Sequence, residues 1–275
     1  MPHSKIGILA GGGMLPVLVR DACRSRNLPY HVVVFEGQGE PADFSADSHA
    51  VIRLGAGGAS IKSLKAAGCD TLIMAGTIRR PNMKELRPDW WGVKFFASSG
   101  AAALGDDGLL AALIKALEGE GFNVIGADDV LTDYLMPKGV IGARIPDDAQ
   151  EADIAAALKA AKGLGARDKG QAAVARDGTT IAEEQADGTD AMLRRLAAAG
   201  NTGGILAKTL KPGQERRADL PTIGPDTIAN AHAAGLSGVV IDAGNAFLLD
   251  RDGTAKAADA FGMFLIGVDA DGNWQ

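Results

Sequence analysis

The stretch that decides the fold lies near the amino terminus and reads Ile6-Gly7-Ile8-Leu9-Ala10-Gly11-Gly12-Gly13-Met14-Leu15-Pro16. It begins as a short apolar run, which predicts a strand, and it ends in three consecutive glycines. A segment with helical spacing follows over 15–25, and Pro16 is allowed in the first turn of that helix. Outward from this stretch, apolar runs and helical segments alternate along the chain. The alternation predicts β-α-β crossovers and a mostly parallel, doubly wound α/β sheet.

The pattern lapses near residues 134–146, where two prolines and two glycines fall close together, and we place a domain boundary there. The prediction is α/β throughout: a Rossmann-like amino-terminal domain over 1–134, a linker over 135–148 and a carboxy-terminal α/β catalytic domain over 149–275. Strands are expected over 6–10, 31–35, 51–54, 71–75, 123–125, 172–176, 179–182, 205–210, 239–242, 246–250 and 264–268. Helices are expected over 15–25, 57–67, 106–118, 147–164, 190–199 and 225–234.

Local signals support several of these boundaries. Asp177-Gly178, between two expected strands, predicts a tight β-hairpin turn. Asp106 or Asp107 is expected to cap one helix, and Asp147 or Asp148 another.

Composition excludes several classes of protein. The chain has 275 residues, 47% of them hydrophobic, and a formal net charge of −6, so it is neither disordered nor a strongly basic nucleic-acid binder. Its two cysteines are too few for a disulfide scaffold. No apolar run is long enough for a secretory signal or a membrane span. The expectation is a soluble, cytoplasmic protein with no nucleic-acid partner.

The glycine turn is the first candidate for chemistry. Backbone N–H groups of Gly11, Gly12 and Gly13 can approach an anion closely, and the following helix adds partial positive charge. Glu36, at the end of the next strand, stands where an acidic residue binds a ribose hydroxyl in dehydrogenases. Pro16 replaces the third glycine of that fingerprint, and its ring is expected to obstruct close helix–strand packing. A phosphate or nucleotide cradle, a plain tight turn and an NAD(P)-linked oxidoreductase therefore all stay open.

Two segments of the second half carry further candidates. Thr189 and Asp190 follow a glycine at a loop-to-helix transition, where helix capping is the simpler interpretation. The alternative places Asp190 near a metal ion or an attacking water, and Thr189 near phosphate. Residues 208–227 hold four cations within ten residues, followed by two aspartates seven residues apart. Cations suit a pyrophosphate, and carboxylates suit Mg²⁺ or the positioning of water.

The pairs Trp90-Trp91 and Phe95-Phe96 hold much of the aromatic content. Consecutive aromatic residues cannot all face one core from a regular element. Core packing is the commoner explanation. The alternatives are an apolar chamber for a lipid-like ligand and contact with a bilayer surface.

Three of these segments together resemble the LpxI family, the UDP-2,3-diacylglucosamine pyrophosphatases of lipid A biosynthesis. They are Ile8–Pro16, Gly188-Thr189-Asp190, and Lys208-Thr209-Leu210-Lys211-Pro212-Gly213-Gln214 continued by Asp219-Leu220-Pro221-Thr222-Ile223-Gly224. The resemblance implies two α/β domains and Mg²⁺-dependent attack of water on the β-phosphorus of UDP-2,3-diacylglucosamine. UMP and lipid X, 2,3-diacylglucosamine 1-phosphate, are the implied products. The resemblance also implies that the enzyme acts at the cytoplasmic face of the inner membrane of Gram-negative bacteria, with peripheral membrane contact.

Matching the motif positions gives a set of expected site residues. The expected catalytic residues are Asp226, Asp190 and Lys208, and the expected metal ligands are Asp226, Asp190 and Asp219. The expected substrate-binding residues are Gly11, Gly12, Gly13, Met14, Leu15, Thr189, Lys211, Gln214, Arg217 and Thr222. The glycine-rich loops of one domain are expected to hold the uridine half. A protein that binds lipid or nucleotide without turnover stays an alternative.

Overall fold

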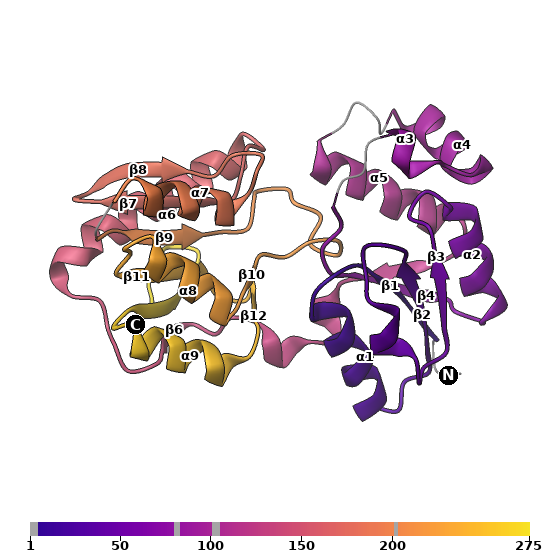
Figure 1. Cartoon of the computed structure of the whole chain (residues 1–275), viewed down its shortest axis with the longest axis horizontal. Helices are drawn as coiled ribbons and strands as arrows, with labels where there is room; N and C mark the ends of the chain where they lie inside the picture. Colours follow the sequence, from indigo (N-terminus) through magenta and orange to yellow (C-terminus); the bar gives the residue numbers. More distant parts are fainter. Residues whose placement is uncertain (1–4, 80–82, 101–104, 201–202) are drawn as a thin grey trace. The chain divides into compact units, whose positions relative to one another are not determined.

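The computed structural model of the chain describes residues 5–79, 83–100, 105–200 and 203–275, and it contains two compact units (Figure 1). The first unit comprises Met1–Thr132 together with Glu215–Asp219. The second comprises Asp133–Gln214 and Leu220–Gln275. A five-residue segment from the second half of the sequence thus belongs to the first unit. Each unit is described by itself.

The first unit is built on a five-stranded sheet in the order β3-β2-β1-β4-β5, in which every pair of neighbours is parallel. This is the Rossmann-like arrangement that the alternation of strands and helices predicts. The strands are β1 (Ile6–Ala10), β2 (Tyr30–Phe35), β3 (His49–Ile52), β4 (Thr71–Ala75) and β5 (Asn123–Ile125). The helices are α1 (Leu15–Ser25), α2 (Gly57–Ala66), α3 (Met83–Leu86), α4 (Trp90–Ser99) and α5 (Asp106–Gly119).

Apolar side chains of α2 and α5 cover one face of this sheet. Leu64 of α2 and Ile114 of α5 pack with Val33 and Leu72 of the strands. Gly7 of β1 allows the close approach, because a Cβ there would lie 2.4 Å from Leu64 Cδ2. The apolar run at the start of the chain is therefore the buried centre of the first sheet.

The second unit has a six-stranded mixed sheet in the order β6-β13-β11-β9-β7-β8, beside a two-stranded β10-β12 ladder. Strands β9, β11 and β13 are parallel, whereas β6, β7 and β8 each pair antiparallel with their neighbours. The strands are β6 (Gly139–Ile141), β7 (Ala172–Arg176), β8 (Thr179–Glu183), β9 (Ile205–Lys208), β10 (Thr222–Ile223), β11 (Gly238–Asp242), β12 (Phe247–Leu248) and β13 (Phe264–Val268). The helices are α6 (Asp148–Ala166), α7 (Thr189–Ala198), α8 (Pro225–Ala233) and α9 (Arg251–Ala260).

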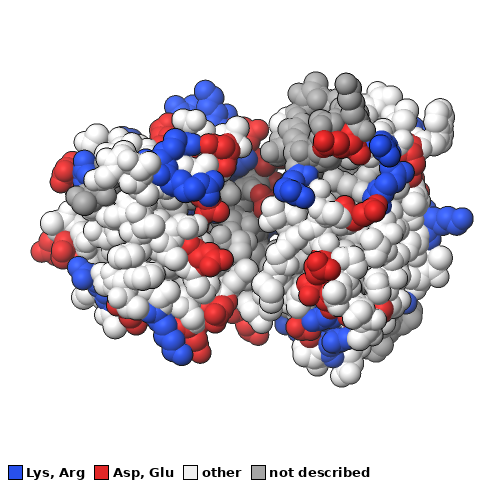
Figure 2. All heavy atoms as spheres, in the orientation of Figure 1, with Lys and Arg blue, Asp and Glu red and all other residues white. Residues whose placement is uncertain are grey.

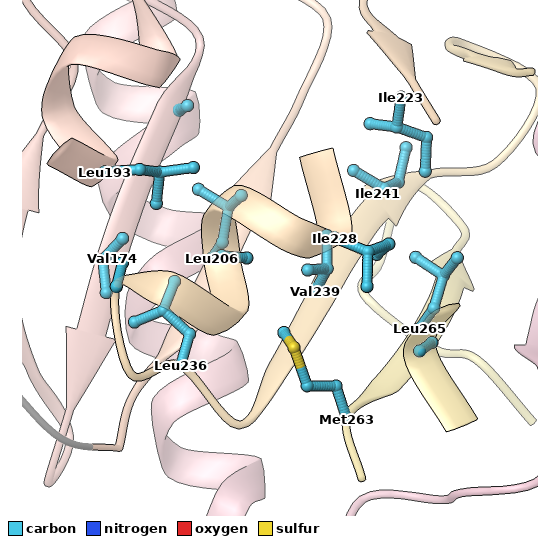
Figure 3. Close-up of a cluster of buried hydrophobic side chains, with 14 of the residues drawn as sticks. Val174, Leu193, Leu206, Ile223, Ile228, Leu236, Val239, Ile241, Met263 and Leu265 are labelled. Carbon is cyan, nitrogen blue, oxygen red and sulfur yellow. The ribbon is translucent and has the colours of Figure 1, made fainter. Parts of the chain in front are cut away.

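Helices cover both faces of this second sheet. On one face, α6 packs on alternate strand residues that include Ala207 and Val240. On the other face, α7, α8 and α9 pack on the remaining set, which includes Leu206, Val239 and Ile241 (Figure 3). Since side chains alternate along a strand, Lys208 lies on the α7–α8 face with Leu206.

The structure differs from the sequence-based expectation at several boundaries. The segment expected to link the domains contains β6, which pairs with β13 and so belongs to the second sheet. The hairpin turn has positive φ at both Asp177 and Gly178, as its sequence predicts. Asp147 caps α6 by accepting a hydrogen bond from Gln150 N, but α5 begins at Asp106 itself, with Gly105 in the capping position.

Candidate functional site

Lys208 marks the first candidate site, at the edge of the second sheet where parallel strands β9 and β11 end. It is the last residue of β9 and is half-buried. Among the residues that the structure describes, its ammonium group makes no hydrogen bond or ion pair. A half-buried cation without a carboxylate partner is suited to an anionic ligand.

The amino ends of α7 and α8 reach the same edge. Each helix leads into a strand of the sheet, α7 into β9 and α8 into β11, and runs back along it (Figure 1). The residues before these helices are Gly188 and Gly224, which have no side chain to cap the exposed amides. Two helix amino ends therefore add partial positive charge beside Lys208.

Asp190 and Asp226 lie in the first turns of these two helices, and both are exposed. Asp190 Oδ1 accepts a hydrogen bond of 3.1 Å from Nδ2 of Asn230. Asn230 lies four residues after Asp226, so it shares a face of α8 with that aspartate. The contact between α7 and α8 thus places Asp190 against the face of α8 that also carries Asp226.

These two carboxylates fit the donor set that Mg²⁺ uses. Mg²⁺ is usually bound by one or two carboxylates, with waters and substrate phosphates completing its octahedron. Across the described residues, no group of three or more His, Cys, Asp or Glu side chains could hold a metal ion. Asp190 and Asp226 could hold Mg²⁺ only if phosphate or water supplies the other ligands.

Thr189 does not cap its helix, so the capping interpretation is wrong at this position. Gly188 occupies the capping position, and Thr189 is the first helical residue. Its buried hydroxyl donates a 2.7 Å hydrogen bond to Oε1 of Glu184. Because that proton is already donated, the Thr189 hydroxyl is not free to donate to phosphate.

The chain after β9 forms a turn in which the expected phosphate ligands have other partners. Lys211 Nζ donates to Oδ1 of Asp168 at 3.0 Å, and the side chain of Gln214 accepts from Lys211 N at 3.1 Å. Thr222 begins β10, and its hydroxyl donates to Leu220 O at 3.3 Å. The charge of Lys211 is thus partly neutralised, in contrast to that of Lys208.

Arg217 and Asp219 belong to the first unit, whereas the edge that carries Lys208 belongs to the second. The Arg217 guanidinium donates to Glu215 at 2.8 and 2.9 Å and to Glu118 at 2.7 Å. Hydrogen bonds to these two carboxylates raise the pKa of Arg217 above its ordinary value. Asp219 is exposed. Within the first unit, Arg217 therefore anchors its segment to α5.

The glycine turn after β1 forms the second candidate site. Gly11 N donates to Ala75 O at 2.9 Å, and Gly12 exchanges hydrogen bonds with Thr77 at 2.8 and 2.9 Å. Gly13 has φ of +83°. Two of the three glycine amides are thus already bonded to backbone.

A pocket of about 300 Å³ adjoins this turn. It is lined by glycines 11–13, Gly37 and Gly39, together with Gln38, Glu40, Asp43 and Phe44. Two carboxylates in the lining disfavour a bound phosphate and favour hydroxyl or amide groups. Of the other expected residues here, Met14 is exposed and Leu15 is half-buried at the start of α1.

Pro16 is buried without disrupting the packing of α1. A Cβ on Gly76 would lie 2.8 Å from Pro16 Cγ, so the glycine at the end of β4 makes room for the ring. Glu36, the residue expected to bind ribose in a dehydrogenase, is exposed and does not line the pocket.

The aromatic residues of α4 divide between core and surface. Phe95 is buried and stacks on Trp91, which packs against the first core. Trp90 is 81% exposed and Val93 is 44% exposed. The core interpretation is confirmed for Trp91 and Phe95, but not for Trp90.

Sequence reasoning missed three polar residues near the first candidate site, Asn230, Glu184 and Asp242. Burial raises the pKa of Asp242, which ends β11 and accepts a 3.1 Å hydrogen bond from Leu210 N. An aspartate at the carboxyl end of a predicted parallel strand is a recognisable signal. Asn230 and Glu184 have no such signal, because helix and loop positions do not reveal their long-range partners.

The structure also bears on membrane contact and on surface charge. No helix among the described residues is long and apolar enough to cross a bilayer. On the face drawn in Figure 2, cationic and anionic side chains are interspersed.

Comparison with known proteins agrees with both halves of the structure. Residues 5–134 match the model of the LpxI N-terminal domain, and residues 137–266 match that of the LpxI C-terminal domain. The chain is 40% identical over 276 aligned residues to the UDP-2,3-diacylglucosamine pyrophosphatase LpxI of Caulobacter vibrioides. The alignment covers 96% of this chain and 98% of that relative. Since two family models and a full-length relative agree, the chain belongs to the LpxI family.

Proposed function

We propose that this protein hydrolyses the pyrophosphate of UDP-2,3-diacylglucosamine to UMP and 2,3-diacylglucosamine 1-phosphate, a step of lipid A biosynthesis. One observation carries the proposal. In the second unit, Lys208, two helix amino ends and the exposed carboxylates of Asp190 and Asp226 lie at the same end of the sheet. The 40% identical relative, which is named as a UDP-2,3-diacylglucosamine pyrophosphatase, supports the same reaction.

The residues at this edge supply the functions that such a hydrolysis needs. Helix amino ends and Lys208 bind the anionic pyrophosphate and stabilise the charge that develops on the bridging oxygen. Asp226, with Asp190 beside it, orients the attacking water and accepts its proton. The water oxygen bonds to the β-phosphorus as the bond from that phosphorus to the bridging oxygen breaks, and UMP leaves with that oxygen.

Mg²⁺ is the cofactor that we propose for this edge. When bound, it neutralises phosphate charge and polarises the phosphorus–oxygen bonds. Asp190 and Asp226, in the first turns of α7 and α8, would hold it through carboxylate oxygens. Asp219 and Arg217, which the family motif assigns to metal and substrate, belong to the first unit, where Arg217 is hydrogen-bonded to Glu118.

The pocket of the first unit suits the uridine half of the substrate. Its volume of about 300 Å³ lies at the small end of the range for ligand pockets. Glu40 and Asp43 can accept hydrogen bonds from ribose hydroxyls or a base N–H, but they repel phosphate.

We place peripheral membrane contact at α4. Trp90, Val93, Lys94 and Ala97 are exposed and follow the spacing of one helix face. The opposite face is anchored through Phe95. Tryptophan and lysine together suit the boundary of a bilayer with anionic phospholipid. A net charge of −6 makes attraction to that surface local to such a patch.

The experiment is release of UMP from UDP-2,3-diacylglucosamine with Mg²⁺ and with EDTA. We expect Mg²⁺-dependent release that falls at least about 100-fold in Asp226→Asn. Asp148→Asn is the matched control, because Asp148 is also an exposed aspartate in a first helical turn, but on the face of the sheet opposite α8. Binding without UMP release would indicate a carrier, and hydride transfer with NAD(P) would indicate an oxidoreductase.

A further inference from the structure

Glu184 is a buried carboxylate to which the proposed chemistry gives no role. It follows β8 and is 9% exposed. Its Oε1 accepts the 2.7 Å hydrogen bond from the Thr189 hydroxyl, and its Oε2 accepts a 2.6 Å hydrogen bond from Gln171 N. Both carboxylate oxygens are therefore occupied by donors from different parts of the chain.

These two contacts join both sides of the proposed catalytic edge. Thr189 begins α7 and precedes Asp190 directly. On the other side, Gln171 O accepts a 2.9 Å hydrogen bond from Thr209 N, and Thr209 follows Lys208. A continuous path of hydrogen bonds thus runs from the residue before Asp190, through Glu184 and Gln171, to the residue after Lys208.

The surrounding backbone leaves room for this carboxylate. A Cβ on Gly170 would lie 3.1–3.2 Å from three atoms of Glu184. Glu184 N also donates to Ala172 O at 2.9 Å, which extends the β7–β8 ladder by one residue. The carboxylate is therefore fixed from its own backbone as well as from its two donors.

We propose that Glu184 is a positioning residue for hydrolysis, which holds Asp190 and Lys208 at the separation that the pyrophosphate requires. The proposal rests on the proposed function and deepens it. Glu184 acts through Thr189 and Gln171 and does not touch the substrate. Thr189 contributes through its bond to Glu184, and its hydroxyl proton is not given to phosphate.

The test compares Glu184→Gln with Glu183→Gln. Glu183 is the matched control, because it is the neighbouring glutamate but is exposed. Its Oε1 lies 3.8 Å from a guanidinium nitrogen of Arg167, in a loose ion pair at the surface. A glutamine at 184 can accept from Gln171 N, but its amide then presents N–H groups to Thr189. We expect kcat/KM to fall about tenfold in Glu184→Gln, mainly through kcat, and to stay within about twofold in Glu183→Gln.

A double-mutant cycle with Thr189→Val separates positioning from general destabilisation. Because both changes remove the bond in which the Thr189 hydroxyl donates to residue 184, the double variant should lose about as much kcat/KM as the worse single variant. Thr189→Ser, which keeps the hydroxyl, should lose less than Thr189→Val. Additive losses would overturn the proposal. So would a lower unfolding temperature in Glu184→Gln with unchanged kcat/KM.

Amide hydrogen exchange makes the test independent of activity. In Glu184→Gln, but not in Glu183→Gln, exchange should quicken at Gln171 and in the first turn of α7. Unchanged exchange would refute the coupling even if the protein had a different substrate. Absence of UMP release by the unmodified protein would instead refute the proposed function, and the exchange result would still decide whether Glu184 couples the two segments.

Discussion

Lys208 and Lys211 are three residues apart, and the structure predicts that they contribute very differently to turnover. The ammonium group of Lys208 has no partner among the described residues, whereas that of Lys211 lies 3.0 Å from Asp168. Substitution by methionine removes each charge and keeps an apolar stem of similar length. Lys208→Met and Lys211→Met therefore compare a free cation with a paired one.

The expected magnitudes follow from these environments. Loss of one preorganised group that stabilises transition-state charge costs about 3 kcal/mol, which corresponds to about 100-fold in kcat. Loss of an ion pair with a half-exposed partner costs about 1 kcal/mol or less, because solvent screens it. We expect kcat to fall about 100-fold in Lys208→Met and less than about fivefold in Lys211→Met.

The assay is steady-state release of UMP over a range of substrate concentrations, with thermal unfolding of each variant measured in parallel. Lys208→Met should lower kcat by a larger factor than the factor by which it raises KM, because the charge of Lys208 acts most strongly on the transition state. A kcat within about threefold of the unmodified protein would refute the role of Lys208. An equal loss in both variants would show that pairing with Asp168 does not decide which lysine acts.

Two further predictions concern stability and membranes. The pKa of Asp242 is raised chiefly by burial, so the folded state holds this proton more tightly than the unfolded state does. The free energy of unfolding therefore falls as pH rises through the folded pKa. Asp242→Asn lacks this proton, so its free energy of urea unfolding relative to that of the unmodified protein should rise from pH 4 to pH 8, and a difference that stays constant with pH would contradict the assignment. Trp90→Ser should weaken sedimentation with phosphatidylglycerol vesicles about tenfold, whereas Val51→Ser, which changes another exposed apolar residue, should leave it unchanged. Equal binding by both variants would remove α4 from the membrane contact.

Much of the fold follows from local patterns in the sequence. The apolar run of β1 and the periodicity of α1 predict their observed bounds, because each depends on residues adjacent in the chain. The Asp177-Gly178 hairpin is predicted for the same reason, since a two-residue turn needs positive φ at both positions. The prediction fails at β6, whose three residues pair with β13, more than 120 residues later.

The candidate site was only partly predictable. Asp190 and Asp226 stand in the first turns of predicted helices, where a parallel sheet gathers functional groups. Lys208 lies inside the strand expected over 205–210, and the structure shows that this strand ends at Lys208 itself. Arg217 is predicted to bind phosphate because its charge lies close to Lys208 in the sequence. Its partner Glu118 is 99 residues away, and a Pro- and Gly-rich loop has no periodicity that could reveal such a contact.

Both units present a glycine-containing turn before a helix, and the two turns differ in how well they suit a phosphate group. In the first unit, the amides of Gly11 and Gly12 donate to backbone carbonyls, and carboxylates line the adjoining pocket. In the second unit, Gly188 and Gly224 occupy the capping positions of α7 and α8, and glycine has no side chain that could accept from the first helical amides. Lys208 adds a full positive charge at the same edge. Glycine supplies access for an anion, but free donors and unpaired cations supply the attraction. The longer glycine run therefore lies at the site less suited to pyrophosphate, which is why we propose the edge formed by β9, α7 and α8 as the place of cleavage.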